Sequence, residues 1–240
     1  MYERLRCISL RTVKYDDRRS IVTVWSAERG RMGLIVPAGS SRGACRLRAI
    51  MMPMGLFEGE VDIRPGRDLM SIRDVRPLAV LSSMSSSPAK AVVALFLAEV
   101  LERILRESAP DRLLSEFIFG AVEMLDATPP RGVDNFPLIF LCKLGEFLGI
   151  SPDVAEWRPG SYFDMTGGVY RRSAPTSGRW LGPREAATAA ILQRLEFSTA
   201  ARLGIDKPTR RAMLDAILEY YTIHLAPLDS LRSLEVLRTL

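Results

Sequence analysis

The chain has 240 residues, of which 48% are hydrophobic and 25% charged, and its formal net charge is +5. This balance is typical of an ordinary globular protein and excludes a disordered tail. No stretch reaches the ~18 to 20 uncharged apolar residues that a membrane-spanning helix needs, and the first residues do not resemble a signal peptide. We therefore expect a cytoplasmic protein.

The amino-terminal third is predicted to form short strands separated by polar turns, because β-branched and aromatic residues alternate between Gly, Pro and Asp clusters. No helix of useful length is expected there, and residues 37–46, rich in Gly, Ser and Arg, are expected to form a loop. The expected strands cover residues 5–15, 21–25, 32–36, 50–63 and 69–75. Five strands in so short a segment favour a small barrel.

A Ser-rich segment, residues 82–88, ends in a proline and marks the clearest change of composition. We place a domain boundary there, giving domains 1–80 and 81–240. Beyond it the apolar period changes from two to 3.6, which predicts a mostly helical domain. The expected helices cover residues 89–106, 113–125, 136–148, 183–195 and 208–224, with a β-hairpin insertion near residues 161–172.

Positive charge is concentrated at the amino terminus. The first 48 residues hold eleven bases and four acids, whereas the whole chain carries only +5. One guanidinium group can bind two phosphate oxygens at once. The excess of positive charge at the amino terminus therefore predicts that the barrel binds nucleic acid. The alternative is a charged surface that only keeps the protein soluble, but such a surface would distribute its basic residues more evenly along the chain. The candidate DNA-binding residues are Arg6, Lys14, Arg18, Arg19, Arg29, Arg31, Arg42, Arg46 and Arg48.

Two aromatic residues and three methionines on the predicted barrel leave alternatives open. Tyr15 and Trp25 either stack on bases or belong to the core. Met51, Met52 and Met54 fit the barrel core, with a partner-binding groove as the alternative.

Catalytic and cofactor motifs are missing. His224 follows Tyr220 and Tyr221 at the end of a predicted helix, which favours packing or capping over general-base duty. The acidic pair Asp16-Asp17 lies between basic residues, which would neutralise it, and therefore fits a solvated turn better than a cation site. No phosphate-binding loop of the Walker or dinucleotide type occurs, and three widely spaced cysteines indicate reduced thiols. We expect a protein that is not an enzyme and holds no cofactor.

The helix expected at residues 89–106 has a wide apolar surface. Lys90, Arg103 and Arg106 on or beside it could receive an acidic peptide that ends in an aromatic residue. The alternative is an ordinary bundle core with solvated ends.

Several segments, in their order and spacing, resemble the RecO family of bacterial recombination mediators. The resemblance lies in residues 10–24, 28–31, 38–42, 47–49, 96–105 with Glu107 and Pro110, 140–144 with 148–149 and Pro152, and 163–164 with 167–169. It implies an α+β fold, in which a five-stranded OB-fold barrel precedes a mostly α-helical domain with a small β insertion.

The resemblance also implies a function. It implies that the protein binds single- and double-stranded DNA and anneals complementary strands. It also implies a nucleoid-associated protein, which acts with RecR to load RecA onto DNA coated by single-stranded DNA-binding protein (SSB). It further implies that the helical domain binds the C-terminal tail of SSB. Many relatives bind zinc through four cysteines where residues 153–170 have none, so we predict no metal and a hairpin at residues 162–170 packed by aromatics. The competing hypothesis is a non-enzymatic adaptor whose helical domain binds protein partners.

Overall fold

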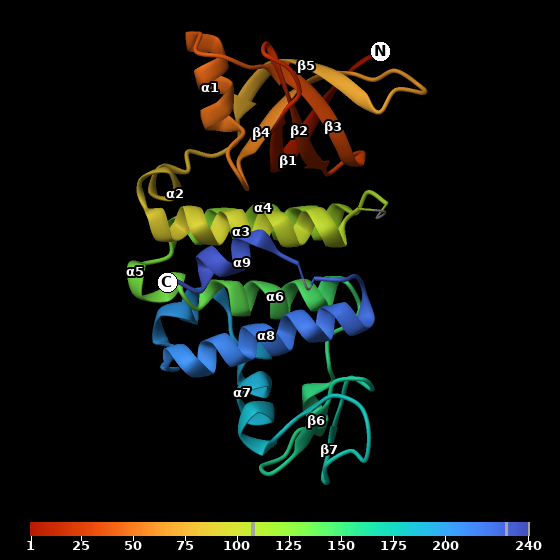
Figure 1. Cartoon of the computed structure of the whole chain (residues 1–240), viewed down its shortest axis with the longest axis vertical. Helices are drawn as coiled ribbons and strands as arrows, with labels where there is room; N and C mark the ends of the chain where they lie inside the picture. Colours follow the sequence, from red (N-terminus) through yellow and green to blue (C-terminus); the bar gives the residue numbers. More distant parts are fainter. Residues whose placement is uncertain (107–108, 229, 240) are drawn as a thin grey trace. The chain divides into compact units, whose positions relative to one another are not determined.

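Five amino-terminal strands close into a barrel (Figure 1). In the computed structural model, which describes residues 1–106, 109–228 and 230–239, the strand order is β1-β2-β3-β5-β4, with only β3 and β5 parallel among the barrel pairs. The strands are β1 (Tyr2–Lys14), β2 (Arg19–Ser26), β3 (Gly30–Pro37), β4 (Leu56–Asp62) and β5 (Leu69–Pro77). The predicted five-stranded barrel is confirmed.

Alternating apolar residues fill the barrel. Leu5, Val22, Val24, Leu34 and Phe57 are buried in one core cluster, as the period of two requires. Met51 joins this cluster and Met54 is fully buried, so the core interpretation is confirmed for these two methionines, whereas Met52 is half-buried.

One short helix inside the barrel segment contradicts the predicted loop at residues 37–46. Helix α1 (Arg42–Ile50) begins after Ser41, whose side chain accepts a hydrogen bond from the backbone N–H of Ala44 at 3.2 Å. This cap satisfies one of the free donors of the first turn. Leu47 and Ile50 then pack against the barrel core. Strand β4 consequently starts at Leu56, later than the predicted residue 50.

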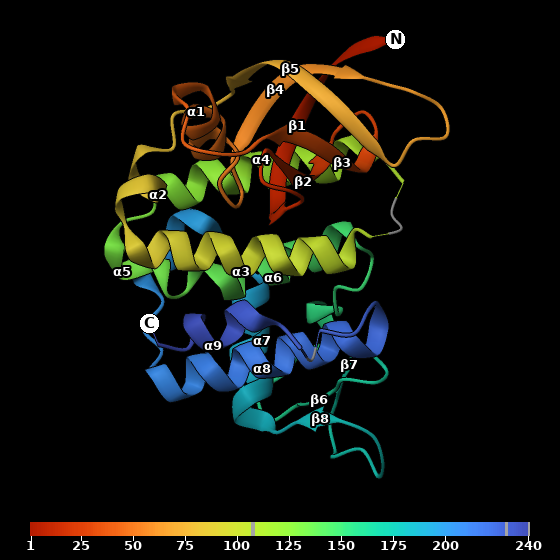
Figure 2. The same cartoon turned by 45° about the horizontal axis from the view of Figure 1, so that its top comes forward.

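Helices α2 (Ser82–Ser86), α3 (Pro88–Ile104) and α4 (Arg112–Ala127) follow the barrel, and α3 and α4 lie side by side (Figure 2). Helix α3 begins at a proline behind the cap residue Ser87, as the Ser-rich break predicted. Its centre is buried, with Phe96 and Leu101 fully enclosed. Glu107, part of the segment that resembles the family, lies outside the described residues.

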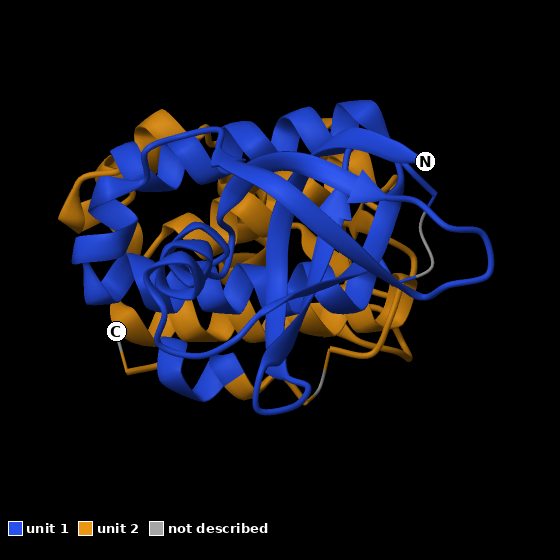
Figure 3. Cartoon of the chain, turned by 90° about the horizontal axis from the view of Figure 1, so that it is seen from above, with its two compact units in different colours: residues 1–127, 233–237 blue, residues 128–232, 238–240 orange. Residues whose placement is uncertain are grey.

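Contacts group the barrel with α3, α4 and five residues of α9 (Arg232–Leu237). This first unit comprises residues 1–127 and 233–237, and the second comprises residues 128–232 and 238–240 (Figure 3). One link within the first unit is the indole of Trp25, whose Nε1 donates to Ser115 Oγ of α4 at 2.9 Å. The predicted domain boundary at residue 80 therefore stays a proposal, namely that the barrel is a domain of its own.

The second unit is mostly helical and carries a small sheet. Its elements are α5 (Pro130–Val133), α6 (Phe136–Phe147), the 3-10 turns Val154–Glu156 and Phe197–Arg202, β6 (Tyr162–Asp164), β7 (Val169–Arg171), β8 (Trp180–Leu181), α7 (Pro183–Gln193) and α8 (Lys207–His224). The sheet has the order β7-β6-β8. The predicted helices at residues 136–148, 183–195 and 208–224 and the predicted hairpin are confirmed.

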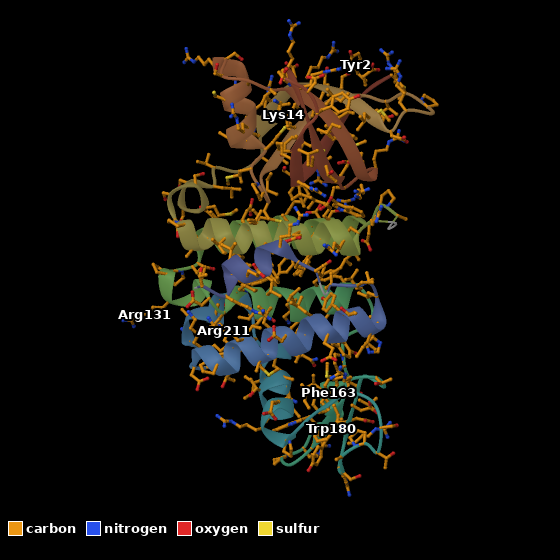
Figure 4. The ribbon with its side chains drawn as sticks, viewed as in Figure 1. Tyr2, Lys14, Arg131, Phe163, Trp180 and Arg211 are labelled. Carbon is orange, nitrogen blue, oxygen red and sulfur yellow. The ribbon has the colours of Figure 1, made fainter. Side chains whose placement is uncertain are left out.

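Aromatic packing holds the β6–β7 hairpin, as predicted. The ring of Phe163, labelled in Figure 4, lies 4.9 Å from that of Tyr170 and 5.6 Å from that of Tyr220. In the turn, Asp164 accepts the backbone N–H of Gly167, which lowers the pKa of its carboxyl. The sole histidine, His224, packs its ring 4.3 Å from that of Tyr220, as predicted, and its Nε2 lies 2.8 Å from the carbonyl oxygen of Met165.

Neither a candidate metal site nor a membrane-spanning helix occurs among residues 1–106, 109–228 and 230–239. None of these residues form a group of three or more His, Cys, Asp or Glu that could hold a metal ion. None of the helices they build has both the length and the apolar character needed to cross a membrane.

Candidate nucleic-acid interface

Arginines on the barrel strands nearest to α3 and α4 are neutralised by these helices. Arg6 Nη2 lies 3.3 Å from Glu116 Oε1 of α4, and a second contact joins it to Glu28. Arg31 lies 3.9 Å from Glu102 of α3, to which Arg11 also binds. These guanidinium groups already have acidic partners, so Arg6 and Arg31 are weak candidates for phosphate binding.

Arg29, in the turn between β2 and β3, is held by a carboxylate as well. Its Nε donates to Glu3 Oε2 at 2.9 Å, and Nη2 contacts the other oxygen of the same carboxylate. Such a two-point pair occupies the Nε–Nη2 edge of the guanidinium. The hydrogen bond with Glu3 also raises the pKa of Arg29.

The other predicted bases lie on two neighbouring segments. The β1–β2 turn meets the residues that lead into α1, because Ala38 N donates to the carbonyl oxygen of Arg18 at 2.7 Å. We call these bases the α1 edge, which consists of Lys14, Arg18, Arg19, Arg42, Arg46 and Arg48. All six side chains are exposed. Lys14 is labelled on the barrel in Figure 4.

Three of these guanidinium groups, on Arg18, Arg42 and Arg46, form no ion pair within the described part of the chain. Arg48 Nη2 donates to the carbonyl oxygen of Gly39. No acid occurs between Glu28 and Glu58, a stretch that contains Arg29, Arg31 and the three arginines of α1. The α1 side of this edge therefore carries uncompensated positive charge.

The two acids of the β1–β2 turn do not prevent phosphate binding at the α1 edge. Asp17 Oδ1 lies 2.7 Å from Lys14 Nζ, and Asp16 Oδ2 lies 2.7 Å from the Arg19 guanidinium, whose hydrogen bond lowers the pKa of Asp16. The four side chains are largely exposed, and such pairs contribute little to stability because water screens their charges. A phosphate group can replace such a partner at little cost, as the predicted solvated turn allows.

Of the two aromatic candidates, only one is accessible. Trp25 is fully buried and its indole bonds Ser115 of α4, so its core interpretation is confirmed and base stacking is excluded for it. Tyr15 is 53% exposed and lies under the guanidinium of Arg19, 5.1 Å from the ring centroid. Tyr15 remains available for stacking at the α1 edge.

The bases predicted to receive a peptide do not form one group. Lys90 is 3% exposed, and its ammonium donates to Ser83 Oγ at 2.7 Å and to the carbonyl oxygen of Asp126. Its placement on a binding surface is wrong, because buried acceptors replace water around this charge. Arg103 lies about 20 Å further along α3, given the 1.5 Å rise per residue. It is partly buried and pairs with Glu99, whereas Arg106 is exposed.

Sequence reasoning missed two kinds of residue. The first kind consists of exposed arginines, Arg67 after the Pro65-Gly66 turn and Arg76 of β5, which form no ion pair among the described residues. Arg67 could have been found from the sequence, because arginines flank the Pro-Gly turn signal. Thr12 and Ser20 line a cavity beneath α1, which no local pattern reveals because α1 itself was expected to be a loop.

A closed five-stranded barrel with this strand order is an OB-fold, and here it precedes a mostly helical region. The family described as "Recombination protein O N terminal" matches residues 1–81, and "Recombination protein O C terminal" matches residues 85–235. The chain belongs to the RecO family of DNA repair proteins.

Relatives resemble the chain over almost all of its length. The DNA repair protein RecO of Bacteroides fragilis is 33% identical over 97% of this chain and 96% of that protein. That of Phocaeicola vulgatus is 31% identical over the same shares, and that of Porphyromonas gingivalis is 30% identical over 98% and 97%.

Proposed function

We propose that this protein is a recombination mediator without enzymatic activity, which binds single- and double-stranded DNA along the α1 edge and anneals complementary strands. The observation that carries this proposal is the set of exposed guanidinium groups on α1, in a stretch without acids from residue 29 to 57, beside the exposed bases of the β1–β2 turn. Phosphate contacts need no particular base, so the same edge serves single and double strands.

Annealing fits this chemistry. Two DNA strands repel each other through their phosphates, and bound arginines reduce that repulsion by displacing counterions. The start of α1 adds backbone N–H groups beside Arg42, a setting that favours phosphate oxygens. No nucleophile or general base is needed, because annealing makes and breaks no covalent bond.

The partners follow from the resemblance of the chain to its family. We propose that the protein acts with RecR, that it helps to load RecA onto DNA coated by SSB, and that it binds the acidic C-terminal tail of SSB near the carboxyl end of α3. Arg103 lies in the last helical turn there, and Arg106 follows it.

Binding of a short single-stranded oligonucleotide at several salt concentrations tests the DNA proposal. If all six bases of the α1 edge neutralise phosphates, log K against log salt falls with a slope of about −4. Fluorescence anisotropy of a labelled oligonucleotide gives both the Kd and the slope. Binding no tighter than about 0.1 mM at physiological salt, the weak end of non-specific affinity, would instead support the adaptor hypothesis.

The SSB tail proposal makes a separate prediction. Replacing Arg106 by Ala is expected to weaken binding of an acidic C-terminal peptide about 2- to 5-fold, the effect of one exposed charge pair, and to leave the Kd for DNA unchanged. The measurement is titration of a labelled peptide. Arg106→Lys, which keeps the charge, is the control, and equal peptide affinity of the Ala variant and the parent would place the peptide elsewhere.

A further inference from the structure

A cavity of about 110 Å³ lies between α1 and the barrel strands beside it. Thr12 and Arg48, both exposed, reach its lining, so the cavity meets the solvent. Its walls are mainly apolar and come from strands β2 and β3, from α1 and from the residue that follows α1, namely Val22, Val36, Ala44, Leu47 and Met51. At about 10 to 15 Å³ for each water-sized group, this volume has room for roughly seven to eleven of them, which is the scale of one pyrimidine base.

Two hydroxyl groups line the cavity. Thr12 of β1 and Ser20 of β2 form no side-chain hydrogen bond within the described part of the chain. Thr12 pairs with Val22 across the β1–β2 ladder, which places its side chain on the same face as that buried valine. A hydroxyl can donate or accept, so both can bind the polar edge of a base of any kind.

Cations of the α1 edge flank the cavity on two sides. Lys14 is paired with the lining residue Ser20 in the ladder, and Arg48 lines the cavity from α1. Ala38, which also lines it, is held by the carbonyl oxygen of Arg18. A phosphate backbone bound by these residues would therefore cross the mouth of the cavity.

We propose that the cavity receives one unstacked base of a single DNA strand while the α1 edge holds the neighbouring phosphates. This inference rests on the proposed DNA binding. A base in a duplex is stacked and paired and is not free to enter, so the cavity favours single strands over double strands in a protein whose phosphate contacts alone do not distinguish them.

The test compares a short oligothymidylate with an oligomer of the same number of phosphates in which every base is missing. The parent protein is expected to bind the oligomer with bases roughly 5- to 150-fold more tightly, a preference as large as that of one base stacked on an aromatic side chain. Thr12→Phe places a ring at the cavity mouth and is expected to lose most of this preference. Val13→Phe adds the same ring at the next residue, on the opposite face of β1, and should keep it.

A fluorescent base provides a second readout. The emission of 2-aminopurine, quenched by stacking in the free oligonucleotide, is expected to rise on binding to the parent and to Val13→Phe and to change little with Thr12→Phe. If Thr12→Phe does not fold, Thr12→Val combined with Ser20→Ala keeps the shape of the cavity and removes both hydroxyls, and a several-fold smaller preference is expected.

The outcomes separate the two proposals. Equal affinity of the parent for both oligomers overturns the base site and leaves phosphate binding intact. A preference that survives in Thr12→Phe also overturns it, because the base is then held elsewhere, with Tyr15 as the exposed alternative. Absence of binding to either oligomer refutes the proposed DNA binding itself.

Discussion

Replacing both Arg42 and Arg46 by Glu is expected to weaken single-stranded DNA binding about 10- to 100-fold at low salt and to slow annealing of complementary oligonucleotides in proportion. Both side chains are exposed and form no ion pair with any described residue. The change removes two phosphate contacts and adds two repulsive charges. The slope of log K against log salt should become less steep by about 1.4, since each contact to a single strand contributes about 0.7.

Loss of folding would not explain such a result. Arg42 occupies the first turn of α1, where a positive charge opposes the helix dipole and a negative charge favours it. The double variant should therefore unfold at a urea concentration no lower than that of the parent.

A matched control separates the α1 edge from the general charge of the protein. Arg172→Glu with Arg184→Glu lowers the formal net charge from +5 to the same value of +1. Both residues are exposed in the second unit, and neither forms an ion pair with a described residue. Affinity and annealing close to the parent values are expected for this control. Equal losses in the two double variants would remove the α1 edge from the binding site.

Replacing Trp25 by Ala is expected to lower the free energy of unfolding by about 3 to 5 kcal/mol, the usual cost of removing a large buried ring. Trp25 is fully buried and donates to Ser115 Oγ of α4, so the change leaves a void and breaks a link between the barrel and that helix. Urea denaturation followed by circular dichroism measures the loss.

Tyr15→Ala is the aromatic control for this experiment. Because Tyr15 is 53% exposed, its replacement should change the unfolding free energy by less than about 0.5 kcal/mol. If its ring stacks on a base, the same variant weakens oligonucleotide binding. Parental stability of Trp25→Ala would contradict the assignment of Trp25 to the core.

The regular elements could be predicted from local sequence patterns because each repeats over many residues. Alternating β-branched residues marked β2, and a 3.6 period behind a Ser-Pro start marked α3. Helix α1 could not be predicted this way, because Gly43 and the preceding Gly39-Ser40-Ser41 are typical of a loop. Its apolar residues, Leu47 among them, are stabilised by the barrel, which is a tertiary contact.

The sequence by itself determined that positive charge is concentrated on an amino-terminal barrel, because charge and strand pattern are both local properties. Only the tertiary structure decided which of those charges are free. Arg6 meets Glu116 across 110 residues of chain, whereas no acid faces Arg42 or Arg46 within the described residues. The physical reason is that an ion pair or a buried charge such as Lys90 depends on partners within a few ångströms, and the fold sets those distances irrespective of separation along the chain.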